Sequence, residues 1–237
     1  MTAHVLMLSS SRQGTEDYLA HAKPHILTHL GKRRELLFIP YAGVTTSWDD
    51  YVGAVQGALP ECQVKGIHQF TDPAAAVAQA DANGQAIVVG GGNTFHLLNT
   101  LYQNNLISPI QQAIDCGTPY IGWSAGANIC GATIRTTNDM PIIEPPSFNA
   151  LGILPCQLNP HYTDYQPPNH NGETRDQRLA EFTTLHPDIP VLAIREGTAL
   201  RLSSGQMTLL GDKDGVVFKG TTRTILRVGE DLSKYLA

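Results

Sequence analysis

One serine in the chain stands in a context typical of a nucleophile. Residues 122–126 read Gly-Trp-Ser-Ala-Gly, directly after a β-prone run and directly before a series of small residues. A G-x-S-x-G sequence between a strand and a helix predicts a tight turn that holds its serine in a strained conformation at the strand end. A tight turn without a catalytic role could have the same sequence, but the flanking strand and helix favour Ser124 as a nucleophile.

A serine hydroxyl needs a neighbouring base, which must come from the nine histidines of the chain. His161 is favoured because it directly follows an expected strand, where active-site loops gather, and His170, in a proline-rich loop, is the second candidate. Three other histidines form one stripe of the first expected helix, where no carboxylate or cysteine completes a metal site: His21, His25 and His29. We therefore expect no metal there.

Two carboxylates could orient the base. Asp139, in Thr-Thr-Asn-Asp-Met, would give the chain order Ser124, Asp139, His161 that is known from other serine hydrolases. Glu196, in Ile-Arg-Glu-Gly, is the alternative acid. Either one could instead be a solvated loop carboxylate, and the sequence does not decide which of them contacts His161.

Acyl transfer also needs donors for an oxyanion. Gly90-Gly91-Gly92-Asn93 follows an expected strand and opens an expected helix, so backbone N–H groups can approach a ligand closely. A phosphate cradle is the alternative, but neither G-x-G-x-x-G nor Gly-Lys-Ser/Thr is present. An oxyanion hole made by the N–H groups of Gly92 and Ala125 fits the sequence better.

Apolar runs typical of strands alternate with helical segments through the first half of the chain. This alternation predicts an α/β fold with a mostly parallel central sheet and helices on both faces, followed by a small antiparallel C-terminal part. The expected strands are 5–9, 36–40, 64–68, 86–89, 120–123, 154–158, 191–194, 199–202, 207–210, 216–218 and 224–228; the expected helices are 17–30, 48–59, 73–79, 94–103, 108–116 and 173–185.

The overall composition limits the class of protein. The chain has 237 residues, 42% of them hydrophobic, and a net charge of −5, which suits a globular protein without a nucleic-acid partner. No apolar run approaches the about 20 residues of a membrane span. Scattered cysteines without a C-x-x-C motif predict reduced thiols in the cytoplasm: Cys62, Cys116, Cys130 and Cys156. We expect one domain, residues 1–237, as a monomer or homodimer without a cofactor.

With these motifs assembled, the chain resembles the S51 family of serine peptidases. The likeness extends over essentially the whole chain, and the matching segments occur in the family's order and spacing: residues 89–95, 120–128, 134–141, 159–161 and 172–178. The resemblance implies a glutamine-amidotransferase-like α/β fold with serine in place of those relatives' catalytic cysteine. It also implies that the enzyme cleaves dipeptides with an N-terminal aspartate.

The same resemblance implies roles for single residues. Ser124 would be the nucleophile, His161 the base and Asp139 the acid, with Glu196 as the other acid considered in the family. Gly92 matches an oxyanion glycine. Arg175, in the Gly172–Arg178 motif, would receive the substrate's side-chain carboxylate; alternatively, Arg175 or Arg178 forms helix-surface pairs with nearby glutamates.

Three other functions stay open on the sequence. A cyanophycinase-like hydrolase of the same family would act on β-aspartyl-arginine. An esterase of the α/β-hydrolase class shares the G-x-S-x-G turn. A non-enzymatic binding module would keep the sheet and its glycine loop, although the joint presence of Ser124, Asp139 and His161 argues against it.

Overall fold

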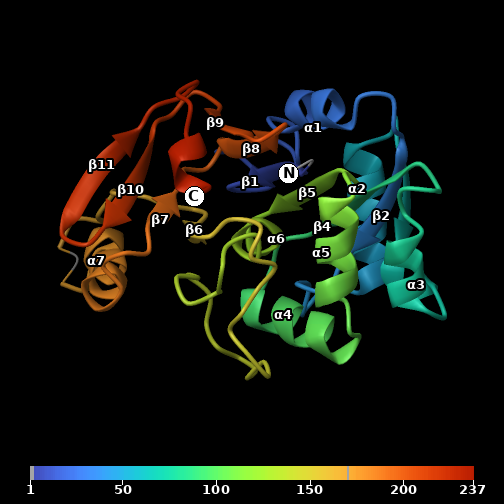
Figure 1. The fold of residues 1–237 in the computed structure, drawn as a ribbon, viewed down its shortest axis with the longest axis horizontal. Helices are drawn as coiled ribbons and strands as arrows, with labels where there is room; N and C mark the ends of the chain where they lie inside the picture. The colour runs from blue at the N-terminus through green and yellow to red at the C-terminus, as the bar shows by residue number, and fades with distance from the viewer. Residues whose placement is uncertain (1–2, 170) are drawn as a thin grey trace.

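The computed structural model describes residues 3–169 and 171–237. Its main sheet has seven strands in the order β3-β2-β4-β5-β1-β8-β9 (Figure 1). The first five of these strands pair in parallel. Strand β8 runs antiparallel to β1, and β9 runs antiparallel to β8. Their bounds are β1 His4–Leu8, β2 Glu35–Ile39, β3 Gln63–Gly66, β4 Gln85–Val89, β5 Tyr120–Trp123, β8 Ala199–Ser203 and β9 Gln206–Leu210. The expected α/β class with a mostly parallel sheet is confirmed.

Helices cover both faces of this sheet. They are α1 Lys23–Leu30, α2 Trp48–Ala58, α3 Pro73–Ala78, α4 Thr94–Gln103, α5 Ile107–Asp115 and the single turn α6 Ala125–Asn128. Successive strand residues point to opposite faces, so Leu6 and Leu8 of β1 pack in the core layer under α1 and α2. Val5 and Met7 pack in the other layer, with α3 to α6. Burial on both faces explains why these strands read as continuous apolar runs.

A second sheet of four strands lies beside the first, in the order β11-β10-β7-β6 (Figure 1). Its strands are β6 Gln157–Asn159, β7 Val191–Ala193, β10 Gly215–Lys219 and β11 Thr222–Leu226. Helix α7, Arg175–Leu185, packs on one face of this sheet through Leu179 and Phe182. The opposite face, through Leu192 and Val217, joins the main core.

The expected antiparallel C-terminal strands are present, but they are divided between the two sheets. Strands β8 and β9 extend the main sheet, whereas β10 and β11 belong to the second sheet, in which β6 and β7 are parallel. Short strands of similar pattern do not reveal their partners, because pairing is set by tertiary contacts rather than by local sequence.

Two element boundaries also differ from expectation. The first helix begins at Lys23 rather than at residue 17, because Leu19 is buried with a left-handed φ of 60° that no helix accommodates. Pro24 then lies in the first turn of α1. The third strand ends at Gly66, and His68 lies in a 3₁₀ turn, Ile67–Gln69; a second such turn spans Ser233–Tyr235.

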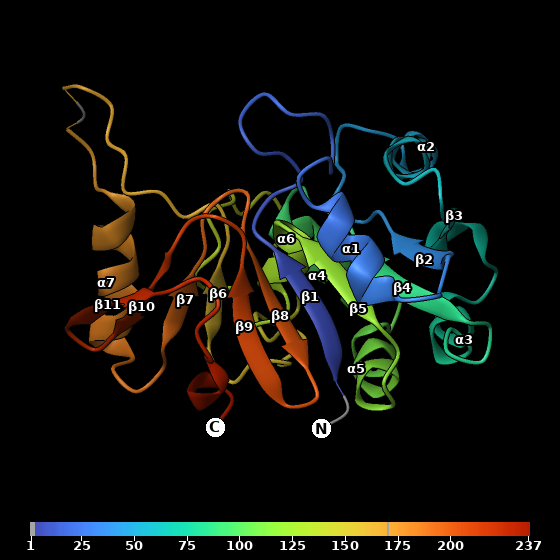
Figure 2. The same cartoon turned by 90° about the horizontal axis from the view of Figure 1, so that it is seen from above.

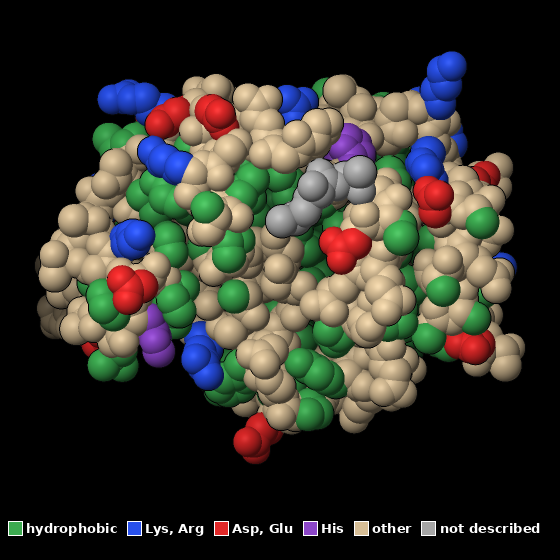
Figure 3. All heavy atoms as spheres, in the orientation of Figure 1, with side chains coloured by type: hydrophobic (Ala, Val, Ile, Leu, Met, Phe, Trp, Pro, Cys, Tyr) green, Lys and Arg blue, Asp and Glu red, His purple; other side chains and the backbone are tan. Residues whose placement is uncertain are grey.

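The start of β1 and the C-terminus lie at one end of the molecule, and the loop that follows β1 lies at the other (Figure 2). The carboxyl ends of the parallel strands face that second end, where ligands bind in sheets of this class. Among the residues that the structure describes, none of the helices is both long and apolar enough to cross a bilayer. On the face drawn in Figure 3, acidic and basic side chains are interspersed.

Strand β5 and α6 approach so closely that residue 122 must be a glycine, which can be tested by substitution. A Cβ at this position would lie 2.3 Å from the carbonyl oxygen of Gly126, so Gly122→Ala forces backbone to move. We expect Gly122→Ala to lower the free energy of unfolding by about 1–3 kcal/mol in urea denaturation. Gly53 of α2 is exposed, with no atom within 4 Å of an added Cβ. Gly53→Ala should therefore raise stability by about 0.5–1 kcal/mol. Equal effects of the two variants would contradict this reading of the turn.

Candidate active site

Ser124 lies in the strained turn that the sequence predicts. Its φ and ψ are 53° and −113°, a conformation that L-residues rarely adopt. The turn is held at both ends: the Ser124 N–H donates to the carbonyl of Leu8 at 3.1 Å, and its carbonyl accepts from Asn128 at 2.8 Å. Gly126 must lack a side chain, because a Cβ there would lie 2.3 Å from the carbonyl oxygen of Val89. The backbone thus presents the hydroxyl at the carboxyl end of β5.

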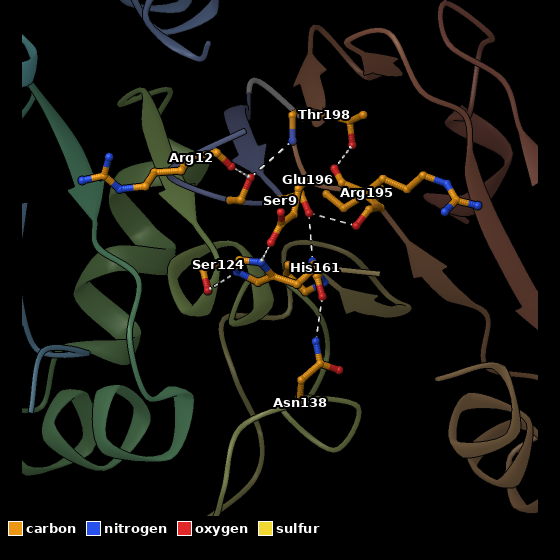
Figure 4. Close-up of polar contacts among 12 residues, drawn as sticks. Ser9, Arg12, Ser124, Asn138, His161, Arg195, Glu196 and Thr198 are labelled. Carbon is orange, nitrogen blue, oxygen red and sulfur yellow. Dashed lines mark hydrogen bonds and ion pairs between the residues drawn. The ribbon is translucent and has the colours of Figure 1, made fainter. Parts of the chain in front are cut away.

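His161 reaches this hydroxyl from the end of β6. Its Nε2 lies 2.8 Å from the Ser124 Oγ (Figure 4). His161 also has a positive φ, 55°, and its N–H donates to the Ser9 Oγ at 2.9 Å. The Ser9 hydroxyl in turn donates to the carbonyl of Ile194 at 2.9 Å. Ser9, directly after β1, therefore fixes the backbone that carries the imidazole. His170, the second candidate, lies outside the described residues.

Glu196 is the carboxylate that contacts the imidazole. Its Oε1 lies 2.8 Å from the Nδ1 of His161, so Ser124, His161 and Glu196 form a continuous chain (Figure 4). Glu196 lies in a turn closed by a hydrogen bond of 3.0 Å from the Thr198 N–H to the carbonyl of Arg195. Gly197, the next residue of the turn, has a φ of 87°, as a type II turn requires at its third position.

Asp139, the acid favoured by chain order, does not hydrogen-bond to His161. Its Oδ2 instead accepts from the N–H of Thr94 at 2.7 Å and from the Thr94 hydroxyl at 2.5 Å. Thr94 is the first residue of α4, so the carboxylate also lies at the positive end of that helix. Chain order misled here because a triad is defined by geometry, and the loop with Asp139 is directed to α4.

The glycine loop after β4 packs directly against the reactive serine. A Cβ on Gly91 would lie 2.9 Å from the Ser124 Cβ. Gly92 has a φ of 135°, and a Cβ there would lie 2.2 Å from the carbonyl oxygen of Ala42. Within the described residues, neither the Gly92 N–H nor the Ala125 N–H donates a hydrogen bond. Both amides are therefore available to a ligand beside Ser124.

A cavity of about 210 Å³ opens next to these groups, and its wall holds charges of both signs. Asp139 and Arg175 line it together with Ser124 and His161. Asn128, on the turn after the serine, also lines it, and its buried Oδ1 has no hydrogen-bond partner among the described residues. The cavity therefore offers a cation, a carboxylate and an unsatisfied acceptor next to the nucleophile.

Arg175 is the first residue of α7, where the helix dipole disfavours a cation. It is half-buried, and no carboxylate in the described part of the chain forms an ion pair with it. Burial, with a smaller effect from Arg178, lowers the pKa of Arg175, and Asp139 opposes the change. The expected surface pair with Glu173 is made by Arg178 instead, at 3.6 Å. A desolvated, unpaired guanidinium favours binding of an anion.

The histidines of the first helix region make other contacts than those of metal ligands. Across residues 3–169 and 171–237, no three histidine, cysteine or acidic side chains gather as metal ligands. His29 instead stacks on His4 with ring centroids 3.8 Å apart. Burial lowers the pKa of His29 to about 3, so its ring stays neutral.

Sequence reasoning missed two residues of the site. Ser9 could have been found from its place directly after an expected central strand, where polar side chains meet the ligand edge. Asn128 follows Ser124 by four residues, so it lies on the same helix face as the serine. Asn128 ends the matching segment 120–128, but its contact with Leu158, like that of Ser9 with His161, joins residues distant in the sequence.

The comparisons with known proteins agree with this geometry. The model of peptidase family S51 matches residues 5–210. Proteins described as peptidase E align end to end with the chain: one from Shewanella denitrificans is 52% identical and one from Shewanella amazonensis 51%, with full coverage of both chains. The chain belongs to peptidase family S51. S51 membership makes it a serine peptidase, a hydrolase, as the motifs indicated.

A solved structure extends the likeness of this S51 chain to the fold. A peptidase from an acI-B1 Actinobacterium superimposes with a TM-score of 0.68 at 18% identity, covering 98% of this chain and 97% of the other. At that identity the likeness supports the α/β fold alone.

Exchange of the two carboxylates for amides separates their roles. Glu196→Gln removes the charge that stabilises a protonated His161, so we expect kcat to fall by about 10²- to 10⁴-fold. Asp139→Asn leaves the imidazole contact intact, so its main effect should be on KM. Steady-state kinetics of both variants, with far-UV circular dichroism as a folding control, test this. The opposite pattern would make Asp139 the acid.

Proposed function

We propose that this S51 peptidase hydrolyses dipeptides with an N-terminal aspartate through an acyl-enzyme on Ser124. One observation carries the proposal: Arg175, without an anionic partner among the described residues, lines the same small cavity as Ser124 and His161. A planar guanidinium matches a carboxylate in a bidentate geometry. The side chain of an aspartyl residue supplies that carboxylate.

The same cavity also suits the α-ammonium group of the aspartyl residue, through Asp139. Asp139 is half-buried and uses one carboxylate oxygen, Oδ2, for its contacts with Thr94. Its second oxygen and the Oδ1 of Asn128 can both accept from an ammonium group. An N-terminal aspartate carries one carboxylate and one ammonium group, which complement the charges of Arg175 and Asp139, respectively. This arrangement gives Asp139 a binding role.

The reaction follows from the contacts of Ser124. His161 takes the hydroxyl proton as the Oγ attacks the aspartyl α-carbonyl carbon, and Glu196 stabilises the imidazolium that results. The N–H groups of Gly92 and Ala125 bind the oxyanion, each donor contributing about 3–4 kcal/mol. His161 then protonates the leaving amine as the C–N bond breaks. Water, activated by the same imidazole, attacks the ester, releases aspartate and restores the serine.

Labelling tests the acyl-enzyme directly. A fluorophosphonate should modify Ser124 alone, as mapped by peptide mass spectrometry, because among the described residues only the Ser124 hydroxyl hydrogen-bonds to the imidazole ring of His161. Ser124→Ala should lose both the adduct and turnover of Asp-Leu. An adduct on another residue, or full turnover by the variant, would exclude Ser124 as nucleophile.

Arg175 determines specificity for aspartate under this proposal. Arg175→Ala leaves the side-chain carboxylate of the substrate without a cationic partner in a partly desolvated cavity. We therefore expect kcat/KM for Asp-Leu to fall by about 10²-fold or more. Hydrolysis of Asn-Leu, which lacks that charge, should change little. Arg178→Ala is the matched control, because Arg178 lies on the same helix and is exposed. Equal losses on Asp-Leu and Asn-Leu would contradict the assignment. Including β-aspartyl-arginine in the panel tests the cyanophycinase-like alternative.

A further inference from the structure

A second cavity, of about 600 Å³, shares no lining residue with the cavity that Ser124 and Arg175 line. It lies between the loops that follow β1, β2 and β4, and Gly91 and Gly92 form part of its wall. Gly91 also packs against the Ser124 side chain, so this glycine loop separates the second cavity from the first. Figure 4 shows Arg12 and Asn138, which line the second and first cavity respectively, on opposite sides of the Ser124–His161 pair.

The wall of the second cavity is largely apolar. Tyr18 and Tyr51 form its inner part, and Val44 and Ile142, whose exposed fractions are 51% and 55%, lie at its edge. The Tyr51 hydroxyl donates to the carbonyl of Gly91 at 3.0 Å. Burial raises the pKa of Tyr51, so this phenol remains a donor. The hydrogen bond ties the apolar wall to the glycine loop beside the nucleophile.

Arg12 supplies a cation to this cavity. Its Nη1 donates to the carbonyl of Glu16 at 3.1 Å, and its guanidinium lies over the Tyr18 ring, 5.7 Å from the centroid. No carboxylate of the described chain forms an ion pair with Arg12. The side chain is exposed and keeps donors available for an anion.

We propose that this second cavity binds the residue that leaves, with its side chain on the apolar wall and its α-carboxylate at Arg12. The inference rests on the proposed function: the carbonyl carbon attacked by Ser124 carries two substituents, the aspartyl group and the leaving amine. When the aspartyl group occupies the cavity with Arg175, the leaving residue extends to the opposite side of Ser124. A dipeptide then places one carboxylate at Arg175 and the other at Arg12. Aliphatic or aromatic leaving residues are the class that this wall selects.

Substrate pairs test the two contacts separately. Arg12→Gln should lower kcat/KM for Asp-Leu relative to Asp-Leu-amide by about three- to ten-fold, because the amide has no terminal carboxylate to lose. Ile142→Asp should lower kcat/KM for Asp-Leu relative to Asp-Gly by about ten-fold, because glycine has no side chain to place on the wall. Matched controls are Arg227→Gln and Ile225→Asp, two exposed positions that do not line this cavity.

The outcomes distinguish this inference from the proposed function. The ratio of kcat/KM for Asp-Leu to that for Asp-Leu-amide should fall in Arg12→Gln, and the ratio for Asp-Leu to Asp-Gly should fall in Ile142→Asp. Both ratios should stay at wild-type values in the two controls. If wild type cleaves Asp-Leu but neither ratio shifts in Arg12→Gln and Ile142→Asp, the leaving residue binds elsewhere and the proposed function stands. If wild type cleaves no aspartyl dipeptide, the proposed function fails first and this inference fails with it.

Discussion

The hydrogen bond between Ser124 and His161 joins segments 37 residues apart, and each partner has a positive φ. Such backbone conformations cost about 1–3 kcal/mol each for residues with a side chain, so they persist only where the surrounding structure enforces them. Here the enforcement comes from the main sheet. The Ser124 N–H donates to the carbonyl of Leu8 in β1, and the hydroxyl of Ser9, the residue directly after β1, accepts from the N–H of His161. The end of β1 thus positions both reacting groups.

Steric limits around the serine make this arrangement rigid. Gly122 and Gly126 let β5, α6 and β4 approach more closely than any side chain would allow, and Gly91 makes the same contact from the glycine loop. A close-packed interior transmits small displacements, so the position of the hydroxyl depends on all three glycines. The strained turn at Ser124 therefore limits both the backbone geometry and the residue types at these positions.

The two carboxylates of the site make different contacts. Glu196 lies on the loop between β7 and β8, one of the connections between the two sheets, and contacts the imidazole. Asp139 lies at the start of α4 and faces the cavity that holds Arg175. Glu196 can therefore stabilise a proton on His161, whereas Asp139 faces the cavity.

The sequence by itself determined the α/β class, the parallel central strands, the strained turn at Ser124, the glycine loop and the choice of His161 over eight other histidines. These features are local: periodicity fixes strand and helix type, and small residues at fixed spacing fix the turn. The tertiary structure decided which of Asp139 and Glu196 contacts His161 and which strands form the second sheet. It also decided that the first helix begins only after Leu19. Those outcomes depend on pairing between distant segments, and local residue preferences carry no information about distance in space.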